Sequence, residues 1–177
     1  MKRNILLWET TGVFVIFLSG FIFHFAFFWL KQYKPLALIF AVNESVWEHC
    51  KIGFWPALLF SLGEYFFIRK TSSNFFLAKG VLLLTIPLTI ITLFYTYTGV
   101  LGKNFLFIDI SIFLLAVLFG QYLSYKILTL KPLPVLYNYL GFLVVFVLLV
   151  LFSTLTYYPL DIPLFIDKNS GQAGLPK

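Results

Sequence analysis

Five long apolar runs dominate the sequence and restrict the chain to a fold that lies in a bilayer. They extend over residues 5–30, 44–68, 75–98, 106–128 and 133–158. Each run is long enough to cross the hydrocarbon core, which takes about 20 residues of apolar helix. Backbone amides in lipid must be hydrogen-bonded within their own segment, so the runs predict helices. We therefore expect an all-α, polytopic membrane helix bundle with five transmembrane helices.

The composition agrees with a membrane location and excludes several other classes. Of the 177 residues, 60% are hydrophobic and only 11% are charged, whereas about 25% are charged in typical soluble domains. The net charge of +6 is spread between the apolar runs and forms no dense basic cluster. The expected partner is therefore the lipid bilayer and not nucleic acid. The single cysteine, Cys50, excludes an intrachain disulfide and a cysteine-based zinc motif.

The breaks between the runs are short, which favours one compact unit. We expect residues 1–160 to form a single transmembrane domain and residues 161–177 a short polar tail. The first run is too long for the core of a signal peptide, so we interpret it as a retained first crossing.

The basic residues suggest an orientation in the cell membrane. With five crossings, seven Lys and Arg residues fall on the N-terminal side and six on the other. Lys51 lies inside a predicted helix and Lys177 far along the tail, and discounting both strengthens the bias. Because positive residues concentrate in cytoplasmic loops, we expect a cytoplasmic N-terminus.

Ionisable residues inside the bilayer are scarce, and several of them share one depth. Such groups are costly in lipid, so each is by default a functional hypothesis. Counting along the runs places five of them near the face opposite the N-terminus, where we expect them to build an outward-facing polar pocket: His24, Glu44, Glu48, His49 and Asp109. Asn43 and Ser45 are expected to belong to the same pocket.

Two further acidic residues, Glu9 and Glu64, lie near the N-terminal side. We expect them to pair with Arg69 or Lys70, or to stay protonated, in a structural role. Gln121, deeper in the fourth run, is expected to form an interhelical hydrogen bond.

The segment Asn43-Glu44-Ser45-Val46-Trp47-Glu48-His49 is the densest polar element and has a structural alternative. Ser45-x-x-Glu48 fits a capping box at a helix start. On a helix, Glu44 and Glu48 share one face, and Ser45 and His49 share another. Capping explains one carboxylate but leaves His49 and the residues of the other runs unexplained, so both interpretations stay open.

This heptapeptide, followed by Lys51 and Trp55-Pro56, resembles a bacterial integral-membrane family known only as a domain of unknown function. The resemblance covers nearly the whole chain, including His24, Asp109 and the tail residues 163–167. It implies a membrane location and a fold, but no reaction.

Three functions fit these residues. The first is a metal-assisted hydrolase acting on a lipid or membrane-embedded substrate. Zinc would be held by His24 and His49, with Asp109 or Glu48 as the third ligand, since zinc binds imidazole and carboxylate groups and keeps one position open in catalytic sites. The remaining carboxylate of Glu48 and Asp109 would act as general base. The sequence lacks an H-E-x-x-H motif.

The second function is a non-enzymatic accessory component that binds or transports an ion or small molecule, and the third is a purely structural polar network. A Ser45–His49–Asp109 triad is a weaker variant of the enzyme hypothesis, because no strained nucleophile turn accompanies the serine. The sequence leaves open whether the protein is an enzyme, which substrate it takes, and its oligomeric state.

Overall fold

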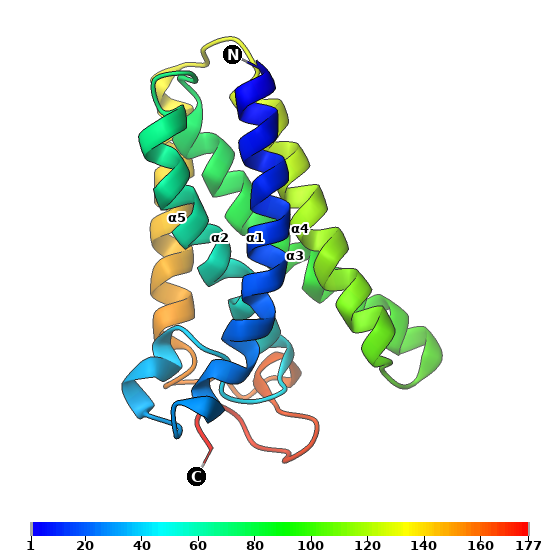
Figure 1. The fold of residues 1–177 in the computed structure, drawn as a ribbon. Helices are drawn as coiled ribbons and strands as arrows, with labels where there is room; N and C mark the ends of the chain where they lie inside the picture. Colours follow the sequence, from blue (N-terminus) through cyan, green and yellow to red (C-terminus); the bar gives the residue numbers. More distant parts are fainter. Residues whose placement is uncertain (1, 177) are drawn as a thin grey trace.

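The computed structural model describes residues 2–176, and they form five long helices that pack side by side (Figure 1). In chain order the elements are α1 (Lys2–Trp29), the 3-10 helix η1 (Lys34–Leu38), α2 (Val46–Ile68), α3 (Phe75–Leu101), α4 (Leu106–Leu128), α5 (Val135–Thr154) and the 3-10 helix η2 (Pro163–Phe165). Within the described residues the only β-type pairing is an isolated bridge between Ile166 and Ala173. The predicted all-α membrane bundle is confirmed, with every helix at the expected place.

Four of the helices are long and apolar enough to cross a membrane, namely α1, α3, α4 and α5. The predicted second crossing, α2, has 23 residues but carries Glu48, Lys51 and Glu64. It packs between α1 and α3, and 14 of its residues are buried. Its charges therefore lie inside the bundle, where α2 can carry more polar residues than the other four helices.

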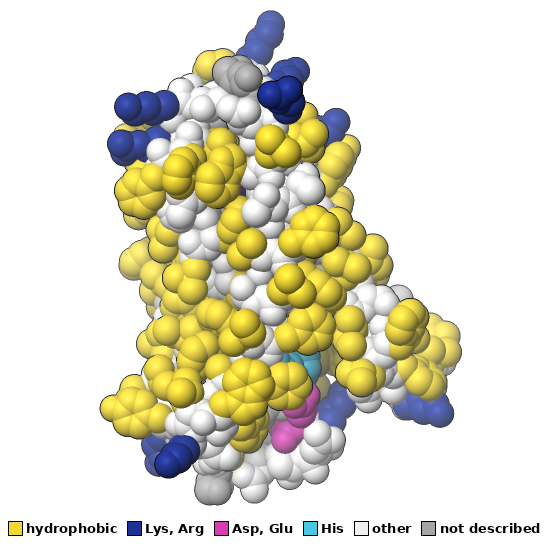
Figure 2. Space-filling view, viewed as in Figure 1, with side chains coloured by type: hydrophobic (Ala, Val, Ile, Leu, Met, Phe, Trp, Pro, Cys, Tyr) yellow, Lys and Arg dark blue, Asp and Glu magenta, His cyan; other side chains and the backbone are white. Residues whose placement is uncertain are grey.

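The outer surface of the bundle is apolar over most of its length (Figure 2). Large side chains such as Phe66, Phe107 and Leu106 expose 73%, 82% and 75% of their surface. Lys and Arg side chains gather at the two ends of the view in Figure 2. An apolar belt between charged ends suits a protein embedded in lipid.

The start of α2 is fixed by local hydrogen bonds in the loop after η1. Ser45 is the N-cap, and its side chain accepts a hydrogen bond from the backbone N–H of Glu48 at 3.4 Å. The side chain of Asn43 accepts one from the backbone N–H of Ser45 at 2.9 Å. The helix thus begins at Val46, so Glu44 lies outside it and does not share a helix face with Glu48, contrary to expectation.

Helices α3 and α5 touch through their backbones at Gly80 and Gly141. A Cβ atom added to Gly141 would lie 2.3 Å from the carbonyl oxygen of Phe76 and 2.5 Å from the Cα of Leu77. Small residues of this kind let helices approach closely in membranes, where packing drives helix association.

Replacing Gly141 with alanine is expected to destabilise the fold by about 1–3 kcal/mol, because rigid backbone atoms of α3 block the new methyl group. Thermal unfolding of the purified protein in detergent measures the effect. Gly63→Ala is the matched control, since a Cβ at this helical position meets nothing within 4 Å. Equal stability of the two variants would contradict the close contact between α3 and α5.

The segment expected to be a polar tail packs onto the end of the bundle. Phe165 is buried and its ring centroid lies 4.9 Å from that of Trp47, which also stacks on Phe152 at 4.4 Å. The side-chain amide of Asn43 donates a hydrogen bond to the carbonyl of Gly174 at 2.7 Å. These contacts hold the tail close to the start of α2.

Candidate functional site

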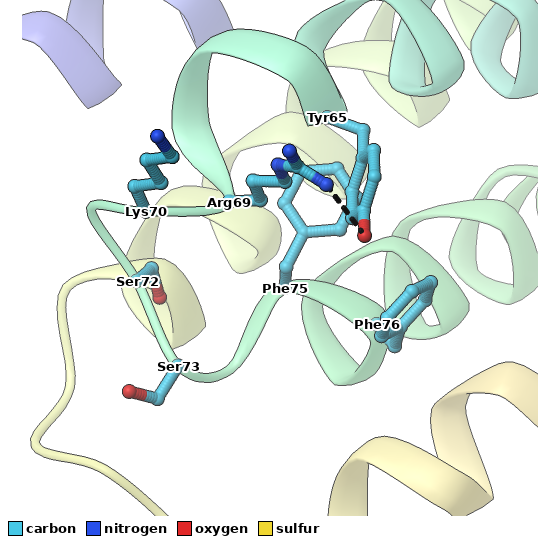
Figure 3. A pocket seen from close by; sticks show the side chains of 7 residues that line it. All are labelled: Tyr65, Arg69, Lys70, Ser72, Ser73, Phe75 and Phe76. Carbon is cyan, nitrogen blue, oxygen red and sulfur yellow. Dashed lines mark hydrogen bonds between the residues drawn. The ribbon is translucent and has the colours of Figure 1, made fainter.

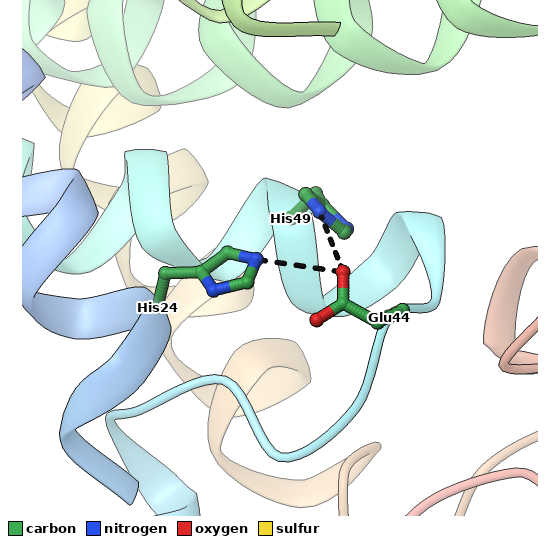
Figure 4. A group of neighbouring side chains, drawn as sticks. All are labelled: His24, Glu44 and His49. Carbon is green, nitrogen blue, oxygen red and sulfur yellow. Dashed lines mark ion pairs between the residues drawn. The ribbon is translucent and has the colours of Figure 1, made fainter. Parts of the chain in front are cut away.

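Two histidines and a glutamate from three segments meet near the end of the bundle that is opposite the N-terminus (Figure 4). His24 belongs to α1, Glu44 to the loop before α2, and His49 to the first turns of α2. The Nε2 atoms of His24 and His49 each lie 3.5 Å from Oε2 of Glu44. One donor atom from each of the three side chains lies within 4.8 Å of the other two.

A hydrogen bond fixes the orientation of one of the imidazoles. Nδ1 of His49 lies 2.8 Å from the carbonyl oxygen of Ser45, one turn earlier. Since a carbonyl only accepts, Nδ1 carries a proton and donates it, so Nε2, the atom that faces Glu44, is the nitrogen left to bind a metal. Nδ1 of His24 is buried and has no hydrogen-bond partner among the described residues, so no contact fixes the tautomer of that ring.

The three side chains could hold a metal ion, since each offers one donor atom and these atoms lie within 4.8 Å of one another. Tetrahedral zinc with ligand bonds of about 2.0–2.1 Å places its donor atoms about 3.3 Å apart. The two imidazole-to-carboxylate separations of 3.5 Å are close to that value, and they are longer than a strong N–H···O hydrogen bond. Three such donors leave one tetrahedral position free, as in catalytic zinc sites.

Glu44 is poised to act as an anionic ligand. A long hydrogen bond from His24 lowers the pKa of Glu44 below its ordinary value, partial burial opposes this, and the charges of His24 and His49 reinforce it. The carboxylate is therefore ionised at neutral pH, which metal coordination requires.

These three residues line a cavity of about 580 Å³. Its walls are mainly apolar and come from α1, α2, α3 and α4, with representative residues Phe21, Phe25, Ile52, Phe94, Ile112 and Phe113. In Figure 1 the C-terminal part of α3 and the N-terminal part of α4 diverge from the other helices, and Figure 2 shows acidic and histidine side chains in a hollow beside them. A cavity of this size can hold a small organic ligand.

Asp109 lines the same cavity but is not part of the three-residue group. Its carboxylate accepts hydrogen bonds from the hydroxyl of Tyr97 and, at 3.1 Å, from the amide of Asn104. The Tyr97 hydroxyl in turn accepts one from the backbone N–H of Phe105 at 3.2 Å. The structure thus brings Glu44, and not Asp109, to the two imidazoles.

Glu48 is separated from the cavity, and this corrects its expected role. Its carboxylate is 1% exposed and pairs with Nζ of Lys51 at 2.6 Å. The hydroxyl of Thr156 donates to Glu48 at 2.7 Å, and the backbone N–H of Val42 donates at 3.2 Å. A carboxylate whose oxygens are occupied in this way holds segments together and does not reach a substrate.

The remaining residues of the expected pocket have local structural contacts. Ser45 caps α2 and Asn43 joins the loop to the tail, as described above, and neither lines the cavity. The capping box is therefore half formed: Ser45 binds the N–H of Glu48, while the Glu48 side chain turns to Lys51.

The sequence interpretation missed the part of the tail that covers the cavity. Lys168 and Asn169 line it, and Nζ of Lys168 lies 4.1 Å from the centre of the Phe94 ring. Burial acts to raise the pKa of Asp167, but hydrogen bonds from Ser170 and from the backbone of Asn169 outweigh it and lower the pKa. The ionised Asp167 stabilises the turn that presents Lys168. The sequence signal that could have indicated this contact is the positive charge of Lys168, which directly follows the tail residues 163–167.

A second hollow, of about 350 Å³, lies at the turn between α2 and α3 on the N-terminal side (Figure 3). Its polar side chains include Arg69, Lys70 and Ser72, and Arg69 donates a long hydrogen bond of 3.5 Å to the hydroxyl of Tyr65. The lining contains no carboxylate or imidazole. It therefore offers no metal ligands, and its exposed cations suit the level of lipid headgroups.

Comparison with known proteins gives a family and no activity. A family model described as "Family of unknown function (DUF6512)" matches residues 2–175. No curated protein and no solved structure matches the chain.

Proposed function

The chain belongs to this family of unknown function, and we propose from its geometry that it is an integral membrane metal-dependent hydrolase acting on an amphipathic substrate. The observation that carries the proposal is the convergence of His24, Glu44 and His49 at the polar end of an apolar cavity. Zinc is the ion that best fits two imidazole nitrogens and one carboxylate oxygen with an open position.

Different residues of the cavity are proposed to bind the metal, to accept a proton and to bind the substrate. His24, Glu44 and His49 would hold the zinc ion, which would supply a Lewis acid for a carbonyl or phosphoryl oxygen and for water. Asp109, held by Tyr97 and Asn104, takes a proton in the reaction as general base. Phe21, Phe94 and the other apolar walls bind the hydrocarbon part of the substrate.

The charge of the cavity favours an anionic headgroup. With a divalent cation bound, the carboxylates of Glu44 and Asp109 are balanced, and Lys168 at the wall adds a positive charge. The diverging ends of α3 and α4 leave a side of the bundle through which a lipid-like molecule enters from the bilayer. The proposed substrate class is therefore an anionic amphiphile.

The distribution of exposed basic residues supports a cytoplasmic N-terminus in the cell membrane. Among residues 2–176, six exposed Lys and Arg residues lie at the N-terminal end of the bundle, and four lie at the other end. The first set is Lys2, Arg3, Arg69, Lys70, Lys126 and Lys131, and the second is Lys31, Lys34, Lys103 and Lys168. Under the positive-inside rule the metal site then lies near the outer face.

One observation favours a second candidate, a component that binds an ion or amphiphile without catalysis. Both carboxylate oxygens of Asp109 already accept hydrogen bonds, so Asp109 would have to break one of these bonds to accept a proton from a reacting water. An accessory protein with a metal-dependent ligand site would have the same cavity.

The test is hydrolysis by the full-length protein in vesicles that contain labelled amphiphiles with ester, amide or phosphodiester bonds. We expect product release that a chelator abolishes and added zinc restores. Asp109→Asn should lower the rate by at least about 100-fold while zinc stays bound. Asp161→Asn, which removes an exposed carboxylate of the tail outside the cavity, is the matched control and should keep the rate.

Two outcomes would decide against hydrolysis. Stoichiometric zinc without turnover of any of the three bond types would support the binding component. Turnover that is insensitive to the chelator would reject the metal-dependent mechanism.

A further inference from the structure

A second buried polar cluster joins four helices in the half of the bundle near the N-terminus. Nζ of Lys79 on α3 lies 2.7 Å from Oε1 of Glu9 on α1 and 2.6 Å from Oε2 of Glu64 on α2. Ser124 on α4 accepts a hydrogen bond from Lys79 at 3.0 Å and donates one to Glu9 at 2.9 Å. None of these four side chains is more than 3% exposed. Glu9 and Glu64 thus pair with Lys79 and not with Arg69 or Lys70.

The cluster has one carboxylate more than it has cations. Glu9 and Glu64 face a single ammonium group, and the described residues around them add no further cation. On α2, Tyr65 and Arg69 bond to each other at the surface. From α4 the neutral Ser124 bonds to the cluster, and the titratable side chains of α5, Tyr137 and Tyr139, are exposed. An unpaired carboxylate buried in lipid is very costly.

Several oxygen atoms of the cluster have no partner. Oε2 of Glu9 and Oε1 of Glu64 accept no hydrogen bond, and both amide atoms of the 2% exposed Gln121 are also unpaired. The carboxyl groups of Glu9 and Glu64 contact the same ammonium group, since Nζ of Lys79 lies 2.7 Å from one and 2.6 Å from the other. Two carboxylates held around one cation in a buried site repel each other unless a proton neutralises one of them.

We propose that Glu9 and Glu64 bind one proton between them, which makes the cluster a proton-binding site inside the membrane. A proton on one carboxyl group lets it donate to the other, and the remaining carboxylate then pairs with Lys79. Carboxyl groups in such contact share a proton because both cannot ionise together. Proton exchange would take place with the N-terminal face, because that is the nearer end of α1.

A proton fits the cluster better than a metal cation does. Sodium takes several oxygen ligands, whereas Glu9 and Glu64 each keep only one oxygen that contacts neither a hydrogen-bond donor nor Lys79. Lys79 in direct contact with both carboxylates also repels a second cation. This site shares no residue with His24, Glu44 and His49, so it stands whether or not the chain binds zinc.

Infrared spectroscopy of the full-length protein in lipid tests the proposal through the carbonyl band of a protonated carboxylic acid. At neutral pH the wild type should show one such buried group, and alkaline pH should remove it. Glu9→Gln and Glu64→Gln should each abolish the band, because the remaining carboxylate is neutralised by Lys79. Asp161→Asn, at an exposed carboxylate of the tail, should leave the band unchanged.

Thermal unfolding shows whether each variant is still folded, so that loss of the band is not caused by misfolding. Since glutamine resembles a protonated glutamate, Glu64→Gln should keep the Tm at neutral pH within about 3 °C of wild type. The proposal is overturned if the wild type has no protonated carboxyl group at neutral pH, or if the band survives in both variants. Selective stabilisation by sodium over choline would overturn it as well, since a cation would then take the place of the proton.

Discussion

Replacing His24 or His49 with alanine is expected to lower the affinity for zinc by more than about 100-fold, since removing a ligand costs more than removing an outer partner. Each variant leaves only one imidazole and the carboxylate of Glu44, which cannot hold the ion tightly in the presence of competing water. Zinc titration of the purified protein, first stripped of metal, gives the affinity.

Control variants separate a metal site from a structural hydrogen-bond group. Asp109→Asn should keep the zinc affinity within a few fold, because Asp109 is bonded to Tyr97 and Asn104 and not to the two imidazoles. Helical circular dichroism should be unchanged in all three variants. Wild-type affinity in both histidine variants would show that zinc binds elsewhere or not at all.

The metal site should also respond to pH with a defined sign. Zinc binds imidazole only in its neutral form, so protons compete with the ion and affinity should fall as the solution is made acidic. The pKa of Glu44 is lowered, so its carboxylate stays ionised to more acidic pH than an ordinary glutamate. The loss should therefore follow the two histidines and not the carboxylate.

The largest loss of stability is expected from Lys51→Met, at about 3–5 kcal/mol. Lys51 is fully buried, and its ammonium group contacts Glu48 at 2.6 Å, the carbonyl of Ala37 at 2.7 Å and the hydroxyl of Thr156 at 2.8 Å. Methionine fills a similar volume but leaves the carboxylate of Glu48 buried without its cation. Chemical or thermal unfolding in detergent measures the change.

A double variant identifies the cause of that loss. In Lys51→Met combined with Glu48→Gln neither of the two positions carries a buried charge, so stability should recover by a large part of the single-variant loss. Lys126→Met, at an exposed lysine on α4, should change stability by no more than about 0.5 kcal/mol. A small effect of Lys51→Met alone would contradict the buried network.

The helix positions could be predicted from sequence because the bilayer fixes their length. Residues 106–128 were expected to form a helix and α4 spans the same residues, and the other helices differ at their ends by a few residues. The largest deviation is at the end of α5, which stops at Thr154, four residues before the expected Tyr158. Local turns and not hydropathy decide where such a helix ends.

The composition of the site was only partly predictable, because depth in the membrane does not give direction around a helix. His24, His49 and Asp109 were expected at one level, and all three line one cavity. Glu48 has the same depth but points to Lys51, three residues later, and to Thr156, 108 residues away in the chain. No pattern in the sequence near Glu48 predicts its contact with Thr156.

Lys79 was counted among the basic residues of the N-terminal side, and Lys51 was discounted because it lies inside a predicted helix, but both are buried. Each lies a few residues inside a helix, at the depth of a carboxylate that needs a cation. Asking which lysine shares the depth of Glu9 and Glu64 would have indicated Lys79. The long lysine side chain usually reaches the headgroups, which favoured the wrong interpretation.

The most direct test of the metal site is X-ray absorption at the zinc edge of the zinc-loaded, full-length protein in lipid. The proposed site requires one zinc ion per chain with two imidazole nitrogens and at least one oxygen at about 2.0–2.1 Å. The spectrum of Glu44→Gln should keep the two imidazoles and change in its oxygen ligands. A wild-type spectrum with one imidazole or none, or a chain that retains no zinc, would contradict the account.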